Sequence, residues 1–469
     1  MALYASIHLR PRKAKTLVLF CVLAPVLVGW VGLVIDGGLL MAGQRQAQNA
    51  ADAAALAGAM NMMQGGTITT ARAAANPFLA SNGLSNAPAL VSGTSFNIPP
   101  KQGPFKGNSQ YVEVIVTNPV QTYFIQAVGA SSTANVTARA VAGYEAVTAG
   151  EGGAVLDPTA VPGLSISGGA TLLVHGRVVI NSQGAGYDQN GNWISLTNPT
   201  TNQPYASYAA TTGNNSTLQG TDIRVVGGVD TPAHFQNVPG NTGNPLHAGV
   251  LPEADPLEYL ATPTTANGVS STSRGAWKNG TQASLLPGVY DSLEINNANY
   301  NFPAGIYVVK GGNFKITGNS TVTGNGVMFY MTGSNYDLTT GSPDSSDGGS
   351  SPPTSGNPTF GGITINGNVG KNAGTVNLTG LNDSTSPFNG MLFYQRRWNT
   401  QGADINGGSD VTQLNGTIYA KWAQFKLDGS GVYNSQFLVG SLALSGQANI
   451  TINYAGKNLG KAPQVFLVE

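Results

Sequence analysis

Cysteine is almost absent from this chain, which has a single one, Cys21, among 469 residues. No intrachain disulfide and no cysteine-based metal site can therefore form. Charge is also scarce: charged residues make up 9% of the chain, against about 25% in an average soluble domain, and 22 Lys and Arg balance 22 Asp and Glu. A nucleic-acid-binding surface needs a basic stripe, so this composition predicts no nucleic-acid partner.

Histidine is scarce too, and the recognisable motifs of metal and cofactor sites are missing. His8, His175, His234 and His247 lie too far apart in the sequence for a ligand pair. The segment DQNGN, which begins at Asp188, lacks the glutamate that completes a calcium loop. No phosphate-cradling loop, serine elbow or zinc helix occurs. We therefore expect no metal, no cofactor and no catalytic residue, and the protein is not expected to be an enzyme.

One long apolar run is present, close to the N-terminus. Residues 16–35 carry no charge and are bounded by Lys15 and Asp36. At about 1.5 Å of rise per residue, a helix of this length crosses a hydrocarbon core of roughly 30 Å. The sequence predicts a transmembrane helix over 16–35, with Asp36 at the membrane exit.

The flanks of this run predict its orientation. Residues 1–15 contain Arg10, Arg12, Lys13 and Lys15, and basic residues are retained on the cytoplasmic side. The remaining chain is then exported. A cleaved signal peptide is the alternative, but the run exceeds the usual apolar length of about 7–15 residues, so a retained single-pass anchor is expected.

Residues 36–64 are predicted to form an alanine-rich helix with a face of very small side chains. Two rows recur at four-residue spacing, one of Ala47, Ala51, Ala55 and Ala59 and one of Ala50, Ala54 and Gly58. Small rows allow close packing of another element. The partner could be a second copy, another subunit, or residues 65–148 folding back; the alternative is a rigid spacer, since alanine is the best helix former.

A lone charge, Asp52, lies in this alanine-rich segment, and it would need a partner if the face is buried. Arg45 and Arg72 are the candidates. Beyond it, residues 65–148 read as a small α/β unit: YVEVIVTN as a strand, QTYFIQAV as a helix and TANVTARAVAGYE as a second strand. Residues 149–160 read as a glycine-rich linker.

From residue 161 to 457 the chain becomes repetitive. A nine-residue pattern, in which a glycine separates two alternating apolar stretches, begins at Leu164, Phe314, Phe425 and Leu442, with a shorter copy at Ile363. Such repeats predict stacked short strands. We expect an α+β protein whose repetitive region is a right-handed parallel β-helix, or alternatively a β-sandwich. Residues 183–285 and 342–359 read as insertions, and 458–469 as a tail.

The N-terminal residues support a family resemblance. The apolar helix, the Asp-Gly-Gly exit and the run QNAADAAALAGA resemble the N-terminal module of TadG-like proteins of the Tad (Flp pilus) system. The strand, helix and strand pattern of 65–148 is similar to the second, pilin-like unit of that family. Many relatives carry a metal-binding Asp-x-Ser-x-Ser motif, but here Asp344-Ser345-Ser346-Asp347 lies in a Pro/Gly/Ser-rich loop, so metal-dependent adhesion is not implied.

The resemblance implies a bacterial inner-membrane protein with a cytoplasmic N-terminus and a periplasmic or surface-exposed C-terminal region. It would be a structural or assembly component of a Tad (Flp) pilus or a related secretion machine. The expected partners are the membrane, other subunits, and a second copy through the N-terminal helix. The alternatives are a surface adhesin or envelope protein and, less favoured, a polysaccharide-active β-helix enzyme.

The enzyme alternative depends on a few charged residues in the repetitive region. Asp404 and Asp410 are close in sequence and follow Arg396, Arg397 and Trp398. Glycoside hydrolysis needs two carboxylates roughly 5–10 Å apart. We interpret these carboxylates instead as solvated turn residues.

Overall fold

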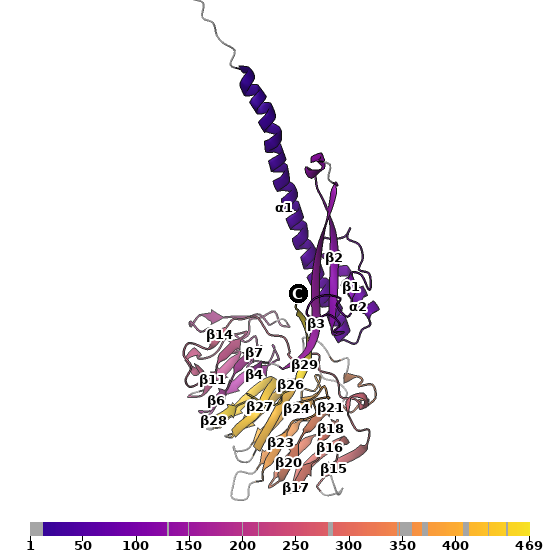
Figure 1. Cartoon of the computed structure of the whole chain (residues 1–469). Helices are drawn as coiled ribbons and strands as arrows, with labels where there is room; N and C mark the ends of the chain where they lie inside the picture. Colours follow the sequence, from indigo (N-terminus) through magenta and orange to yellow (C-terminus); the bar gives the residue numbers. More distant parts are fainter. Residues whose placement is uncertain are drawn as a thin grey trace, which may run out of the picture. The chain divides into compact units, whose positions relative to one another are not determined.

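A computed structural model describes residues 13–128, 131–148, 150–198, 200–213, 215–279, 285–344, 347, 359–367, 374–406, 412–429, 431–446 and 449–469. They form two compact units (Figure 1). The first, called here the helix–hairpin unit, is the chain up to Ala146 together with Pro463–Glu469. The second, the stacked-strand unit, is Val147–Ala462. In sequence, the second unit is inserted between two strands of the first.

A single helix of 51 residues, α1 (Lys13–Met63), covers both the predicted transmembrane run and the alanine-rich segment. Gly37 and Gly38 do not interrupt it. The helix ends just before Gly65, whose φ of 84° lies in the left-handed region that terminates helices. The N-terminal part of the predicted cytoplasmic segment lies outside the described residues.

The rest of the helix–hairpin unit is a small sheet with short helices. The sheet has the order β1-β2-β3-β29. Its elements are α2 (Ile68–Ala75), α3 (Pro77–Ser81), β1 (Phe96–Asn97), β2 (Tyr111–Gln121), η1 (Ile125–Val128), β3 (Thr133–Thr148) and β29 (Lys461–Leu467).

Two elements of this unit differ from the sequence interpretation. The segment QTYFIQAV, expected as a helix, contains only the short 3-10 turn η1, because β2 continues to Gln121 and the chain then turns back into β3. The residues expected as a tail form β29, and the amide of Val141 in β3 donates to the carbonyl of Glu469 at 2.8 Å. The C-terminus therefore completes the sheet that begins near residue 96.

A buried carboxylate links three parts of this sheet. Glu113 on β2 accepts hydrogen bonds from Arg139 Nε on β3 (2.7 Å), Asn97 Nδ2 on β1 (2.7 Å) and the backbone amide of Lys101 (3.1 Å). Burial alone raises the pKa of Glu113, but these hydrogen bonds and the charge of Arg139 outweigh it and hold the pKa below its ordinary value. Arg139 also pairs with Glu469.

In the described part of the stacked-strand unit, 23 strands join into one extensive sheet that closes around a hydrophobic core. The pairings described within it are parallel, whereas a β-sandwich is built from antiparallel pairs, so the sandwich alternative is wrong. Antiparallel pairing in the described part of this unit is confined to a two-residue hairpin, β8 (Gly186–Tyr187) with β9 (Trp193–Ile194), and to the isolated bridges Tyr187–Val229 and Thr197–Pro204. The strands fall into three parallel stacks.

The first stack contains, in spatial order, β17 (Asn299–Phe302), β20 (Thr321–Asn325), β23 (Val376–Thr379), the starts of β26 (Thr412–Asp428) and β27 (Gly431–Ser445), β28 (Asn449–Ile452), β6 (Thr171–Val174), β11 (Thr217–Gly220) and β13 (Phe235–Asn237). Asn299 and Thr321, neighbours in this stack, are 22 residues apart in sequence.

The second stack contains β15 (Ser273–Lys278), the start of β16 (Gly288–Asn296), β18 (Gly305–Lys310), β21 (Val327–Thr332), β24 (Met391–Gln395), the middles of β26 and β27, β4 (Glu151–Val155), β7 (Arg177–Ile180), β12 (Asp222–Val225) and β14 (Leu246–Ala248).

The third stack contains the ends of β15 and β16, β19 (Phe314–Gly318), β22 (Ile363–Gly367), β25 (Ala403–Asn406), the ends of β26 and β27, β5 (Leu164–Ile166) and β10 (Ala210–Thr212). Two 3-10 turns, η2 (Pro232–His234) and η3 (Thr265–Asn267), lie between strands of the unit.

The spatial order of the strands is not their order in the chain. The chain enters in the middle of the stacks at β4 and advances to β14 at one end. Residues 249–272, called here the crossover segment, then return to β15 at the opposite end. From β15 the chain advances back to the middle, where β27 pairs with β4 and β5, and β28 pairs with β6. The first and last strands of the unit are thus neighbours.

The nine-residue repeats all lie at one corner of the unit, where the chain passes from the third stack to the first. The copies at Leu164 and Phe314 run from β5 to β6 and from β19 to β20. The glycine of each turn has a positive φ, 81° at Gly168 and 68° at Gly318, which explains why the pattern requires glycine there. The described part of the shorter copy at Ile363 lies in β22, at the same corner.

Several predicted boundaries differ from this arrangement. The expected linker 149–160 contains β4, which pairs with β7 and β27. The expected insertion 183–285 contains β10, β11 and β12, which are regular members of the stacks. These strands have only three or four residues, so their alternation is too short to be recognised in a polar sequence.

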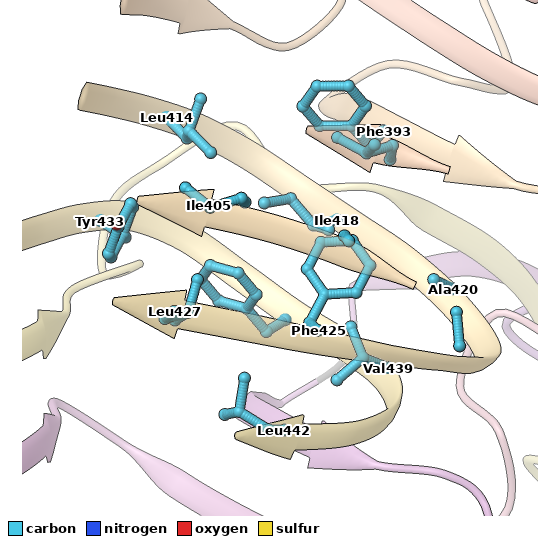
Figure 2. Packing of buried hydrophobic residues seen from close by; sticks show 14 of the residues in the cluster. Phe393, Ile405, Leu414, Ile418, Ala420, Phe425, Leu427, Tyr433, Val439 and Leu442 are labelled. Atoms are coloured by element: carbon cyan, nitrogen blue, oxygen red, sulfur yellow. The ribbon is translucent and has the colours of Figure 1, made fainter. Parts of the chain in front are cut away.

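Inward-pointing side chains from all three stacks form one continuous core. Figure 2 shows Ile405, Phe425 and Leu442 of the third stack facing Ile418 and Val439 of the second. Aromatic rings stack along the axis, with ring centroids 5.3 Å apart for Phe329 and Phe393. Each fully buried large apolar side chain contributes about 1.5–3 kcal/mol to the free energy of folding, so the packing of this core stabilises the unit without disulfides.

Candidate functional site

The small-residue face of α1 is fully covered by the chain itself. Ala47, Ala51, Ala55 and Ala59, and likewise Ala50 and Ala54, have no exposed surface and belong to one core cluster with β1, β2, β3, α2 and α3. A Cβ added to Gly58 would lie 3.1 Å from the ring of Phe96. Of the three partners considered from the sequence, the structure places residues 65–148 against this face.

This face extends further towards the N-terminus than the sequence pattern indicated. At Gly43, an added Cβ would lie 2.3 Å from Val120 Cγ2, and the carbonyl of Gly43 accepts a hydrogen bond from Asn118 Nδ2. At Gly32, inside the predicted transmembrane run, an added Cβ would lie 2.5 Å from Phe124. The hairpin of β2 and β3 therefore follows the helix up to its apolar part.

Asp36, which is predicted to lie at the membrane exit, is a buried hydrogen-bond acceptor in the structure. Its side chain is 1% exposed and accepts the amides of Tyr123 (2.9 Å), Phe124 (2.8 Å) and Ile125 (2.7 Å). These are the otherwise unpaired amides at the start of η1. The carboxylate thus fastens the tip of the hairpin to the helix. The sequence singles out Asp36 as the first charge after the apolar run but gives no sign of these backbone partners.

Asp52 does not pair with either predicted cation in the part of the chain that the structure describes. Its Oδ1 accepts a hydrogen bond from Gln48 Nε2 at 2.7 Å, and Gln48 also donates to the carbonyl of Arg139. The charge is half-exposed, at the edge of the covered face. It therefore needs no ionic partner.

In the stacked-strand unit, the outer side of the second stack is also covered. Leu257, Leu260 and Val269 of the crossover segment pack on outward side chains such as Val308 and Tyr330. This explains why β21 and β24 are buried at every position. Strands buried on both faces are typical of covered parallel sheets.

Arg397 holds the crossover segment in place. Its Nη2 donates to the carbonyls of Leu257 (2.7 Å), Glu258 (2.7 Å) and Leu260 (3.2 Å), and its Nε donates to Tyr419 Oη (3.1 Å). The guanidinium lies 5.7 Å from the centroid of the Tyr419 ring. The planar guanidinium directs Nη2 at the carbonyls and Nε at the tyrosine oxygen at the same time, so it joins the crossover segment to β26.

A cavity of about 410 Å³ lies beside the crossover segment. Its lining includes Trp422, Lys421 and three carboxylates, Glu253, Asp255 and Glu258. Two of these carboxylates are already engaged: Asp255 pairs with Lys421 (3.3 Å), and Glu253 lies 3.0 Å from Arg224 Nε. Apolar and charged side chains both line the cavity, and most of its charges hold the crossover segment.

The two arginines considered for an enzyme are committed to internal contacts. Arg396 is buried against Asp344 (3.0 Å) and Asp347 (2.6 Å), and Arg397 is committed to the crossover segment. Asp404 points outwards from β25, and Asp410 lies outside the described residues. Within the described part of the chain, no group of three His, Cys, Asp or Glu side chains could hold a metal ion.

The outer side of the first stack is a regular polar surface, called here the Asn/Thr face. Its outward positions are mostly uncharged amides and hydroxyls, on strands that lie about 4.8 Å apart. Neighbours bond along the stack, as Thr323 Oγ1 does to Asn301 Oδ1 at 2.8 Å. The members described are Asn299, Asn301, Thr321, Thr323, Asn325, Asn377, Thr379, Gln413, Asn415, Asn434, Asn449, Thr451, Thr171, Thr217, Gln219 and Gln236.

Among the described residues, one helix is long and apolar enough to cross a membrane, by its length and composition. It covers Val18–Met63, and only 6% of its most apolar stretch is buried by the rest of the chain. Comparison with known protein families matches residues 15–61 to the family described as Flp pilus-assembly TadE/G-like. Residues 15–61 are called here the Tad segment, after the family that they match.

The match confirms the family resemblance inferred for the N-terminal residues and supports a role in pilus assembly. It covers the helix and its small-residue face but not the stacked-strand unit. No curated protein and no solved structure matches the chain. An apolar N-terminal helix in a Tad segment is consistent with a single-pass membrane anchor.

Proposed function

We propose that the protein is a membrane-anchored structural component of a Tad (Flp) pilus or of a related secretion machine. The observation that carries the proposal is the Tad segment at residues 15–61, which coincides with the apolar half of α1 and its packed face. The helix anchors the protein in the bacterial inner membrane with residues 1–15 in the cytoplasm. The stacked-strand unit is then exported as a scaffold or contact surface.

The proposed role is structural and not catalytic. Arg396 and Arg397 serve internal packing, and the carboxylates beside the crossover segment are mostly ion-paired. Assembly partners would be other subunits of the machine, with a second copy as an alternative partner. The covered face of α1 contributes indirectly, because it holds the helix–hairpin unit in one shape.

We further propose that the stacked-strand unit is a right-handed parallel β-helix. The three parallel stacks support this, since consecutive strands such as β18, β19 and β20 belong to the second, third and first stacks in turn. An experimental structure of the whole protein tests the fold and its hand. A left-handed coil would contradict the proposal.

The functional test is an in-frame deletion in the native bacterium, scored for pili by electron microscopy and for surface attachment. We expect loss of pili, restored when the gene is supplied in trans. Normal pili with normal attachment would contradict the proposed function.

The Asn/Thr face favours one second candidate, a surface adhesin. An uncharged, regular array of donors and acceptors suits a neutral hydroxyl-rich surface such as a polysaccharide. Normal pili with lost attachment in the same deletion strain would support the adhesin over the assembly component.

The proposed orientation has its own test. The variant carries Cys21→Ser and, at an exposed position, Leu251→Cys. Spheroplasts that contain this variant are treated with a thiol reagent that does not cross membranes. Labelling is expected if the stacked-strand unit is exported. Labelling only after lysis would contradict the orientation.

A further inference from the structure

The tip of the β2–β3 hairpin has features that a water-exposed loop does not need. Tyr123 and Phe124 are 62% and 40% exposed, although they lie in an ordered turn held by Asp36. They belong to the stretch 114–138, between Glu113 and Arg139, which contains no Asp, Glu, Lys or Arg. A hairpin end that is uncharged, aromatic and exposed is compatible with an apolar solvent.

The position of the tip along α1 can be read from its contacts. Phe124 lies against Gly32, three residues before the end of the predicted transmembrane run at Ile35. At about 1.5 Å per residue, that contact is roughly 4.5 Å inside the end of the run. The tip therefore lies at the level where a bilayer's hydrocarbon meets its headgroups, if the run spans the bilayer.

The helix surface beside the tip is itself uncovered and apolar. Val31, Leu33 and Val34 are all more than half exposed. Because the tip covers only Gly32 on this turn, its aromatic side chains continue the apolar surface of the helix. Tyrosine is enriched at membrane interfaces, where its ring is apolar and its hydroxyl is wet.

Asp36 provides hydrogen-bond acceptors for backbone amides that would lack water at such a location. A turn that enters an apolar solvent cannot leave its amides without partners, because no water is available to them. The three amides at the turn, those of Tyr123, Phe124 and Ile125, all donate to the Asp36 carboxylate. The carboxylate is also kept from the lipid, since the turn covers it.

We propose that the β2–β3 tip inserts into the lipid interface as a second membrane contact, held to α1 by Asp36. This inference rests on the proposed membrane anchor. Together, the helix and the tip would fix the tilt and rotation of the helix–hairpin unit on the membrane, which a single helix cannot do.

The test uses spin labels on the full chain in vesicles of phosphatidylethanolamine and phosphatidylglycerol. Cys21→Ser gives a cysteine-free protein, into which Tyr123→Cys, Val26→Cys or Val91→Cys is introduced singly. Position 26 reports the span, and position 91 is an exposed site of the same unit. Accessibility to oxygen, which enriches in lipid, is compared with accessibility to a water-soluble nickel chelate.

We expect the label at 123 to be reached by oxygen and protected from the chelate, as at 26 and unlike at 91. Chelate access at 123 equal to that at 91, with 26 protected, would overturn the inference while leaving the anchor intact. Protection at 123 from both reagents would mean that protein covers the tip, which also overturns it. Chelate access at 26 would overturn the anchor and the inference together.

A second variant tests the role of Asp36. In Asp36→Asn, an NH2 group replaces one carboxylate oxygen and can only donate, so at least one turn amide loses its acceptor. We expect the label at 123 to gain mobility and chelate access, while Asp52→Asn, at the edge of the same helix, leaves both unchanged. Equal behaviour of the two variants would overturn the proposed latch.

Discussion

Substitution of Arg397 by methionine tests whether one side chain holds the crossover segment. Methionine retains much of the volume but none of the donors, so the carbonyls of Leu257, Glu258 and Leu260 lose a charged donor. The Tyr419 hydroxyl also loses this donor and keeps its bond to Asp255. Each hydrogen bond to a charged group contributes about 1.5–3 kcal/mol, and these losses are not additive. Together we expect the loss of these charge-assisted hydrogen bonds to cost about 3–5 kcal/mol.

The expected result is local opening of residues 249–272. A loss of 3–5 kcal/mol corresponds to an open population larger by about 10²–10³-fold or more. Proteolysis that samples the open form reports this population. The assay is the rate of cleavage at Glu258 by a glutamate-specific protease, on the full chain in detergent, with the first cut identified by mass spectrometry.

The control is Arg224→Met, which removes a partly exposed arginine that also contacts the crossover segment, through Glu253. An exposed ion pair contributes only about 0–1 kcal/mol, so cleavage should accelerate by a few-fold at most. Equal rates for the two variants would refute the reasoning, because burial would then not distinguish the two arginines.

Three further changes test other parts of the fold. Ala51→Leu should destabilise the helix–hairpin unit by about 1–3 kcal/mol through overpacking and reduce pilus assembly, whereas Asn49→Leu on the exposed side should do neither, as measured by thermal unfolding and pilus counts. Because the pKa of Glu113 is lowered in the folded state, its ionised carboxylate stabilises the fold above about pH 4.3, and this stabilisation is lost as the pH falls through the folded pKa. The free energy of unfolding should therefore fall less below about pH 4 in Glu113→Gln than in the unchanged protein. An equal fall in both would contradict this. Gly168→Ala and Gly169→Ala both force alanine into a left-handed conformation, which costs about 1–2 kcal/mol. Only the Cβ at position 168 would also lie 2.6 Å from the carbonyl oxygen of Gly446, so Gly168→Ala should have the lower melting temperature. Equal melting temperatures would mean that the backbone at this corner shifts to make room for the Cβ.

The sequence was sufficient for features that depend on local pattern. The apolar run, the two rows of small residues and the glycine corner each repeat at a spacing that one element imposes. The helical pattern also continues past the apolar run in the sequence, and α1 is continuous there although Gly37 and Gly38 are poor helix formers. What covers the small residues required the structure, since a row such as Ala47 and Ala51 accepts any closely fitting surface.

Long-range partners of polar residues were the least predictable. Asp36 bonds amides that follow it by 87 to 89 residues, and Arg397 bonds carbonyls that precede it by 137 to 140 residues. These partners are backbone amides and carbonyls, which every residue has, so no particular side chain in the sequence marks them. A sequence signal does exist for the Asn/Thr face, in the outward positions of the strand that follows each glycine corner, such as Thr321 and Thr323.

The order of the stacked strands could not be read from the repeats because every copy of the pattern offers the same surfaces to its neighbours. The order depends on how far the connecting segments can reach. The crossover segment must span about ten strand spacings between β14 and β15, or roughly 48 Å at about 4.8 Å each. Its 24 residues from 249 to 272 could extend to about 80 Å, so this path needs no strain. It follows that β4, β5 and β6, although early in the chain, are covered on one side only when β27 and β28 arrive. The middle of the stack is thus closed by the two ends of the unit, so loss of the last strands would uncover the first ones and not merely shorten the stack.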